Sequence, residues 1–223
     1  LVAMRSPSYG SERRFRELIE AAGGDVRFVD NELFVSTRQA FDEWANADPD
    51  DETPTFKHEA MYRWLRRETG VLMDDGGPVG GEWNYDDENR EVPDETWTAP
   101  PTPSYDPDAL TAETAAWVAE RFETWGDTSV DSFPWPVTRK QACEALTQFI
   151  DERLGEFGAY QDAMRADDWA MAHSLLGSSI NIGLLHPVEV IEAVTDAYDS
   201  RDLPLNAVEG CIRQILGWRE FVR

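Results

Sequence analysis

Cysteine and histidine are scarce in this chain, whose 223 residues include two cysteines and three histidines. A disulfide framework, or a metal site built by this chain alone, needs more ligands of these types. Cys143 and Cys211 lie far apart in predicted helices with apolar neighbours. We therefore expect two buried free thiols and assign no metal ligand in this chain.

The motifs of conventional catalytic sites are missing as well. The sequence contains no G-x-S-x-G elbow, no H-E-x-x-H motif and no C-x-x-C pair. His58, His173 and His186 are scattered, and we expect His173, which precedes Ser174, to be satisfied in a cap or in the core. The glycines of 76–81 miss the G-x-G-x-x-G spacing of a dinucleotide loop. The pattern therefore gives little support to an ordinary hydrolase.

Long apolar runs are absent too. No run approaches the length of a membrane span, and Leu1 opens no signal peptide. We expect a soluble, cytoplasmic and monomeric protein with no membrane partner.

Lysine is nearly absent, whereas acidic residues abound. The chain carries 22 Asp and 22 Glu against 18 Arg and 2 Lys, which gives a net charge of −24. This composition is typical of salt-loving cytoplasms, because carboxylates keep a surface hydrated while strong salt screens their mutual repulsion. The alternative is an acidic surface for a basic partner, but the acids are spread along most of the chain, which favours salt adaptation. Overall charge therefore does not argue against nucleic acid as a partner.

The first 48 residues have the pattern of the end of an α/β domain. A helix is predicted from Ser11 to the pair Gly23-Gly24, residues 25–30 favour a short strand, and Ser36 is placed to cap a second helix. Helix–strand–helix is typical of an α/β domain. We assign 1–48 to the C-terminal part of a Rossmann-like domain whose beginning is absent.

Residues 49–131 are predicted to form an acidic linker with helices near 56–73 and 111–124. Within it, residues 82–131 carry 14 acids and 2 arginines. The helix at 56–73 holds the densest basic cluster of the chain, which consists of Arg63, Arg66 and Arg67. Two interpretations stay open: solvated arginines paired with nearby acids, or a contact with a phosphate or a partner domain.

From residue 132 to residue 223 the chain is predicted to be almost wholly helical. Thr138 and Gln141 form a capping box, and another helix begins at His186-Pro187. In the terminal helix, Asn206 is expected to be the N-cap. The Glu209 side chain, three residues later, is expected to accept from the free backbone amides at the helix start. Its buried stripe is predicted to be Ile212, Ile215 and Leu216. No Gly, Asn or Pro ends this helix, so we expect the chain to be part of a longer protein.

Small and hydroxyl-bearing residues gather before the terminal helices. The residues concerned are Ser174, Gly177, Ser178 and Ser179. Backbone can approach a ligand closely at such a stretch, and free amides at a helix start suit a phosphate. Close packing of helices through small residues is the alternative, and spacing alone does not decide between the two.

Several segments together resemble the photolyase/cryptochrome superfamily. They are FGAYQDAM (157–164), HSLLGSSINIGLLHPVEV (173–190) and EGCIRQILGWREFVR (209–223). The segments RWLRRETGVLM (63–73) and GGEWNYDDENR (80–90) are similar to its prokaryotic iron–sulfur branch, the deoxyribodipyrimidine photolyase-related proteins, which include bacterial (6-4) photolyases. LVAMRSPSYG (1–10) and FVDNELFVS (28–36) look like the later part of that branch's antenna-binding domain.

The resemblance implies a mostly α chain: the end of an α/β antenna domain, the linker, and over 132–223 the first part of an all-helical FAD-binding domain. It implies light-driven repair of ultraviolet-damaged DNA, in which FAD does the chemistry and the protein positions it, so no catalytic residue is assigned. The residues it implies for the flavin's phosphates and ribityl chain are Tyr160, Ser174, Leu175, Leu176, Gly177 and Ser178. It implies Arg219 beside the flavin and Trp218 beside the lesion pocket, with Gln214 and Arg213 as further candidates.

Two departures from the family pattern matter. Gly177 stands where the family usually has a hydroxyl residue. The cysteine ligands of the 4Fe-4S cluster, the rest of the flavin pocket and part of the lumazine antenna site are expected in a longer protein, and neither Cys143 nor Cys211 matches a cluster ligand. A cryptochrome-like photoreceptor without repair and an inactive truncated helical scaffold stay open as alternatives.

Overall fold

The computed structural model describes residues 1–8, 10–46, 56–126, 129 and 133–223, which are mostly helical. They divide into two compact units. The first consists of Leu1–Asn84, His186–Thr195 and Cys211–Arg223, and the second of Tyr85–Leu185 and Asp196–Gly210. The domain boundaries predicted near residues 48 and 131 lie outside the described residues and stay predictions.

A single βαβ element opens the first unit. Strands β1 (Val2–Met4) and β2 (Arg27–Val29) pair in parallel, with Ala3 opposite Phe28, and α1 (Ser11–Ala21) connects them. Parallel strands need such a crossover, because a tight turn cannot return the chain in the same direction. The predicted helix and second strand are confirmed, and β1 was not predicted. In α2 (Arg38–Ala45) the cap is Thr37, whose side chain accepts from the Ala40 amide, so the prediction of Ser36 as the cap was wrong by one residue.

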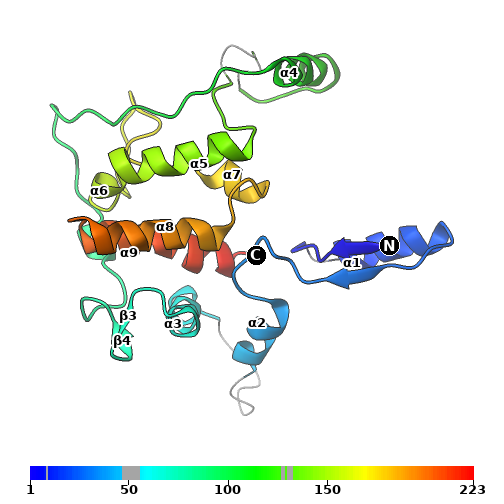
Figure 1. Ribbon diagram of the computed structural model, residues 1–223, viewed down its shortest axis with the longest axis horizontal. Helices are drawn as coiled ribbons and strands as arrows, with labels where there is room; N and C mark the ends of the chain where they lie inside the picture. Colours follow the sequence, from blue (N-terminus) through cyan, green and yellow to red (C-terminus); the bar gives the residue numbers. More distant parts are fainter. Residues whose placement is uncertain (9, 47–55, 127–128, 130–132) are drawn as a thin grey trace. The chain divides into compact units, whose positions relative to one another are not determined.

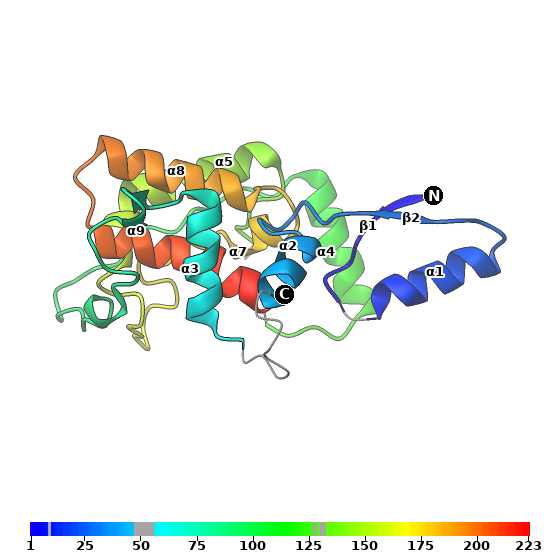
Figure 2. The ribbon, with the colours of Figure 1, turned by 90° about the horizontal axis from the view of Figure 1, so that it is seen from below.

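Helix α3 (His58–Thr69) packs against the terminal helix within this unit (Figures 1 and 2). Its residues Met61 and Leu65 are buried. The helix stops earlier than residue 73 because Gly70 adopts a left-handed conformation with φ 72°. The chain then turns through the antiparallel hairpin β3 (Met73–Asp74) and β4 (Gly77–Pro78).

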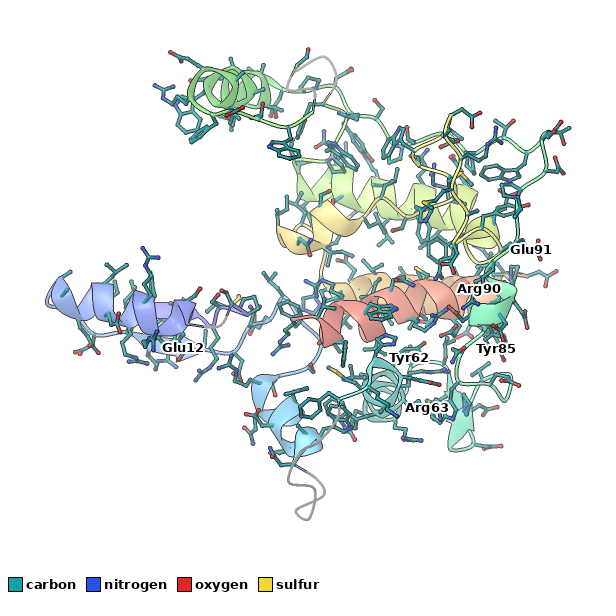
Figure 3. All side chains as sticks on the ribbon, turned by 180° about the vertical axis from the view of Figure 1, so that it is seen from behind. Glu12, Tyr62, Arg63, Tyr85, Arg90 and Glu91 are labelled. Atoms are coloured by element: carbon teal, nitrogen blue, oxygen red, sulfur yellow. The ribbon has the colours of Figure 1, made fainter. Side chains whose placement is uncertain are left out.

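The basic cluster of α3 surrounds one indole ring. The guanidinium groups of Arg63, Arg66 and Arg67 lie 5.4, 5.5 and 4.6 Å from the centroid of the Trp83 ring. Arg66 is fully buried and donates to the carbonyl oxygens of Val71, Leu72 and Trp83. Tyr62 points toward the terminal helix and Arg63 points away from it (Figure 3). Arg66 is thus a structural clamp, and the interpretation of three solvated arginines was wrong for it.

The second unit is built on a capped helix with a buried stripe. The hydroxyl of Thr138 accepts from the Gln141 amide and the Gln141 side chain accepts from the Thr138 amide, so the predicted capping box is confirmed. This helix, α5 (Arg139–Gln148), continues as the π-helix η3 (Phe149–Arg153) and as α6 (Leu154–Phe157). The unit also contains η1 (Asp86–Glu88), α4 (Ala109–Arg121) and α7 (Gly177–Asn181). No residue of α4 is buried.

The last helices are α8 (Pro187–Ser200), α9 (Leu205–Ile212) and the π-helix η4 (Arg213–Arg219). The predicted stripe of Ile212, Ile215 and Leu216 is buried. Asn206 lies inside α9 and donates from its side chain to the amide oxygen of Asn89, so its predicted capping role was wrong. Cys211 is a buried free thiol as predicted, whereas Cys143 is only half-buried. In the part of the chain that is described, no helix has the length and apolarity to cross a membrane.

Candidate cofactor and substrate site

The segment before α7 holds most of the residues predicted to bind the flavin. Leu176 is buried, Ser174 and Leu175 are half-buried, and Gly177 and Ser178 are exposed. Leu175 has φ 57°, and Met171, shortly before it, has φ 47°. Side-chain-bearing residues rarely adopt positive φ, and such outliers cluster at functional sites. This backbone conformation therefore marks residues 171–175 as a segment that its surroundings hold in place.

Arg153 binds the backbone of that segment through hydrogen bonds. Its side chain is 1% exposed and donates to the carbonyl oxygens of Ala170, Met171 and His173 at 2.6 to 3.3 Å. Two more bonds reach the carbonyl oxygens of residues 100 and 101. Burial lowers the pKa of this guanidinium. Sequence reasoning missed Arg153, because backbone carbonyl acceptors carry no residue signature.

The turn that contains Tyr160 lies beside the same segment. The Nε2 atom of His173 is 3.1 Å from the Gln161 carbonyl oxygen, and its Nδ1 atom is 3.1 Å from that of Ala170. Each ring nitrogen of His173 thus has a carbonyl oxygen within hydrogen-bond distance to which a ring N–H can donate, as expected for a satisfied histidine. The Tyr160 ring meets the Trp97 ring edge-on at 4.9 Å, and burial raises the pKa of the Tyr160 hydroxyl. The structure thus brings Tyr160 and residues 174–178 into one region of the second unit.

This region has unused polar capacity. Within the described residues, the Ser179 hydroxyl oxygen is buried and has no hydrogen-bond partner. A buried hydroxyl without a partner is costly, so a polar ligand there would satisfy it. A Cβ atom built on Gly177 meets nothing within 4 Å. The region therefore combines an exposed Gly177 with a buried hydroxyl that lacks a partner among the described residues.

The remaining predicted residues lie in η4, in the first unit. Arg213 is buried, Gln214 is half-buried, and Trp218 is 44% exposed. The imidazole ring of His58 stacks on the Trp218 indole at 3.8 Å between centroids and 12° between planes. A π-helical turn is rare and often marks a functional site. Sequence reasoning did not connect His58 with Trp218, because 160 positions separate them.

Arg219 lies against Phe34, with its guanidinium carbon 4.3 Å from the ring centroid. Its Nε and Nη1 atoms are buried and have no hydrogen-bond partner among the described residues. The nearest carboxylate oxygen, on Glu220, is 3.7 Å from Nη1, which is beyond hydrogen-bond distance. Burial lowers the pKa of Arg219. Two donors of this guanidinium thus lack an acceptor within the described residues.

Glu220 anchors the end of the terminal helix. Its side chain is fully buried and accepts from the Val35 amide, the Ser36 amide and the Ser36 hydroxyl at 2.8 to 2.9 Å. Arg223 donates to the Ser36 carbonyl oxygen and covers the same Phe34 ring at 4.6 Å. Ser36, expected to be a helix cap, therefore serves to hold Glu220 instead.

A cleft of about 440 Å³ opens in the first unit near the carboxyl ends of β1 and β2, where ligands of open α/β sheets bind. Its charged lining consists of Arg5, Arg38, Arg223, Asp30, Asp42 and Glu220. The three positive and three negative groups balance, so the lining favours neither sign of charge. Across the described residues, no cluster of three or more Cys, His, Asp or Glu side chains is arranged to hold a metal ion.

Residues 1–135 match the model of a family described as Deoxyribodipyrimidine photo-lyase-related protein. The chain belongs to this family. The match covers more than half of the chain, including the βαβ element, α3 and the hairpin.

Relatives extend the likeness of this photolyase-related chain into its second half. It is 42% identical over 204 residues to a (6-4) photolyase of Agrobacterium fabrum, an alignment that covers 91% of the chain and 39% of the relative. It is 40% identical over 65 residues to uncharacterized protein R853 of Acanthamoeba polyphaga mimivirus, which covers 29% of the chain and 50% of the viral protein. It is 25% identical over 84 residues to uncharacterized protein R852 of the same virus, with 38% and 42% covered. The aligned regions thus span half or less of each relative's own length.

Proposed function

We propose that this chain is part of a longer light-dependent DNA-repair flavoprotein, a lyase of the deoxyribodipyrimidine photolyase type that acts on (6-4) photoproducts. The observation that carries the proposal is the 42% identity to a (6-4) photolyase over 91% of the chain, within a photolyase-related family. Because the chain covers only 39% of that relative, the proposal concerns the longer protein.

FAD is the proposed cofactor. Tyr160, Ser174, Leu175, Leu176, Gly177 and Ser178 would hold its phosphates and ribityl chain, and Arg219 would lie beside the ring system. The partnerless Ser179 hydroxyl and the two free donors of Arg219 support this assignment, because each lacks an acceptor that a flavin nucleotide would offer. Reduced FAD, when bound and excited by blue light, would supply the electron that opens the photoproduct.

The proposed substrate is ultraviolet-damaged DNA with its photoproduct turned out of the duplex. Trp218 offers an exposed indole surface on which a base can stack, and Gln214 and Arg213 on the same helix are further candidate contacts. The proposed organisation is 1–48 from an α/β antenna domain, 49–131 a linker, and 132–223 from the FAD-binding domain. A lumazine-type antenna and a 4Fe-4S cluster are proposed for the longer protein, with their ligands outside this chain. We also propose a monomeric, cytoplasmic protein from a salt-adapted organism.

A repair assay on the longer protein tests the proposal. Under blue light it should restore an oligonucleotide that carries one (6-4) photoproduct, and the same mixture in the dark should not. An oligonucleotide with a cyclobutane dimer tests the class of lesion. Binding of damaged DNA without repair would support a cryptochrome-like photoreceptor instead.

The 223-residue chain by itself provides a second test. We expect it to show no repair and to retain little FAD, because half of the flavin pocket is proposed to lie elsewhere in the longer protein. Stoichiometric FAD absorbance in the purified chain would contradict that truncation. If the longer protein binds neither flavin nor DNA, the result would favour an inactive helical scaffold.

A further inference from the structure

Two rings restrain the orientation of Trp218. The His58 imidazole covers one face of the indole at 3.8 Å and 12°, and the Phe221 ring meets it edge-on at 6.3 Å and 80°. The Trp218 residue nevertheless stays 44% exposed. A large aromatic side chain that is both restrained and exposed is suited to stacking on a planar ligand.

Gly217 is what permits the stack. A Cβ atom at this position would lie 2.7 Å from the Nε2 atom of His58 and 3.4 Å from the Cγ atom of Arg213. The first distance is shorter than side chains tolerate, so a larger residue would push the imidazole off the indole. Gly217 thus leaves room for the His58 imidazole, and the neighbouring Trp218 stacks against that ring.

His58 is itself held by its surroundings. Its ring lies parallel to Tyr62 at 6.3 Å and 9°, and edge-on to Phe221 at 5.7 Å and 83°. The Nε2 atom is buried without a hydrogen-bond partner among the described residues. Burial, followed by the positive charge of Arg213, lowers the pKa of His58, and Glu59 opposes this shift. A histidine without a hydrogen bond at Nε2 contributes through ring packing.

We propose that His58 is the positioning residue of Trp218: it holds the indole so that its exposed surface can stack on a pyrimidine turned out of DNA. The identity of the stacked base rests on the proposed function. The positioning of Trp218 by His58 rests on the ring geometry alone, so the two parts can fail separately.

The first experiment measures how acrylamide quenches the fluorescence of Trp218 in the 223-residue chain, isolated by subtracting the spectrum of the matching Trp218→Phe variant. His58→Leu should raise quenching by about twofold, because it removes the covering ring, whereas His58→Phe should keep the stack and the low quenching. His186→Leu is the matched control, since His186 bonds the Glu32 carbonyl oxygen and makes no contact with the indole. Gly217→Ala, which displaces the imidazole without removing it, should resemble His58→Leu.

Unchanged quenching in His58→Leu would overturn the positioning role. An equal rise in His58→Phe and His186→Leu would overturn it too, because it would show general loosening of the fold. Circular dichroism identifies any variant that fails to fold. If His58→Leu fails to fold, the comparison of quenching in Gly217→Ala and His58→Phe tests the positioning role.

The second experiment measures the affinity of the longer protein for single-stranded DNA with and without one (6-4) photoproduct. His58→Leu should reduce the preference for the lesion by about tenfold, while His58→Phe should retain it. If the longer protein with His58 intact shows no preference while the quenching results hold, the proposed function fails and the positioning role stands. If His58→Leu exposes the indole but leaves the preference unchanged, the role of His58 in recognition is refuted.

Discussion

Arg66 and Arg153 are buried and donate mainly to backbone carbonyl oxygens. Arg66 ties the end of α3 to the hairpin, and Arg153 ties residues 170–173, which include Met171 at positive φ, to η3. A planar guanidinium with five N–H donors can serve several carbonyls at once. Their environments could not be predicted from the sequence, because any residue supplies a carbonyl oxygen.

Replacing Arg153 should therefore destabilise the chain strongly. Arg153→Met removes five hydrogen bonds and leaves buried carbonyl oxygens without donors, so we expect a loss of about 3 kcal/mol or more in the free energy of unfolding. Urea denaturation measures this loss.

Arg201→Met is the matched control for that measurement. Arg201 pairs with Asp151 on the surface, where both side chains are about half exposed, so the same substitution should cost under about 1 kcal/mol. Equal losses in the two variants would contradict the assignment of Arg153 as a clamp.

The two cysteines should differ in reactivity. Burial raises the pKa of the Cys211 thiol to about 12, whereas Cys143 is half-buried. Because the thiolate is the reactive form, we expect Ellman's reagent at mildly alkaline pH to modify one thiol quickly in the folded chain and both in urea. Cys143→Ser should abolish the fast phase, and a fast phase that persists would contradict the burial of Cys211.

The raised pKa also gives a dependence of stability on pH. Between the unperturbed value of 9.0 and about 12, the unfolded chain loses the Cys211 proton while the folded chain keeps it. The contribution of this thiol to stability is thus complete below pH 9.0 and is lost as pH rises to about 12. In Cys211→Ala, this part of the alkaline destabilisation should be absent from urea titrations.

At the scale of elements, one glycine permits a helix contact in the second unit. A Cβ atom on Gly158 would lie 2.5 Å from the Cα atom of Ala207 in α9, whereas one on Gly155 would meet only the Leu203 side chain at 3.8 Å. Gly158→Ala should therefore force the backbones apart and cost roughly 2 kcal/mol or more. Gly155→Ala, inside α6, should be neutral or stabilise by up to about 1 kcal/mol. Thermal unfolding compares the two, and a tolerated Gly158→Ala would contradict the close approach.

Helix ends show how far local sequence goes. The box of Thr138 and Gln141 forms as predicted, because both partners lie within four residues of each other. Ser36 and Asn206 have equally good capping chemistry, yet their side chains bond Glu220 and Asn89, which are distant in sequence. Because the Ser36 side chain bonds the buried Glu220, the neighbouring Thr37 caps α2 in its place.

At the scale of the whole molecule, charge should govern stability. The net charge of −24 repels itself at low ionic strength, and the Debye length falls from about 10 Å at 0.1 M salt to about 3 Å at 1 M. We expect the unfolding midpoint to rise with KCl and most of the gain to occur below ~1 M, where screening changes most. Sucrose serves as the uncharged control, and a midpoint that is flat or falls in KCl would contradict salt adaptation.

The sequence alone determined the helices with strong apolar stripes, the capping box, the acidic surface and the family resemblance, because each depends on residue identity over short spacings. The family resemblance also implied which residues contact the flavin and the lesion. Only the tertiary structure decided that His58 covers Trp218, that Glu220 holds Ser36 and that Arg153 supports the strained segment before α7. These contacts join residues far apart in the chain through ring faces, buried carboxylates and backbone carbonyls. Such partners produce no periodic pattern in the sequence, so these contacts could not be predicted from it and are known only from the folded structure.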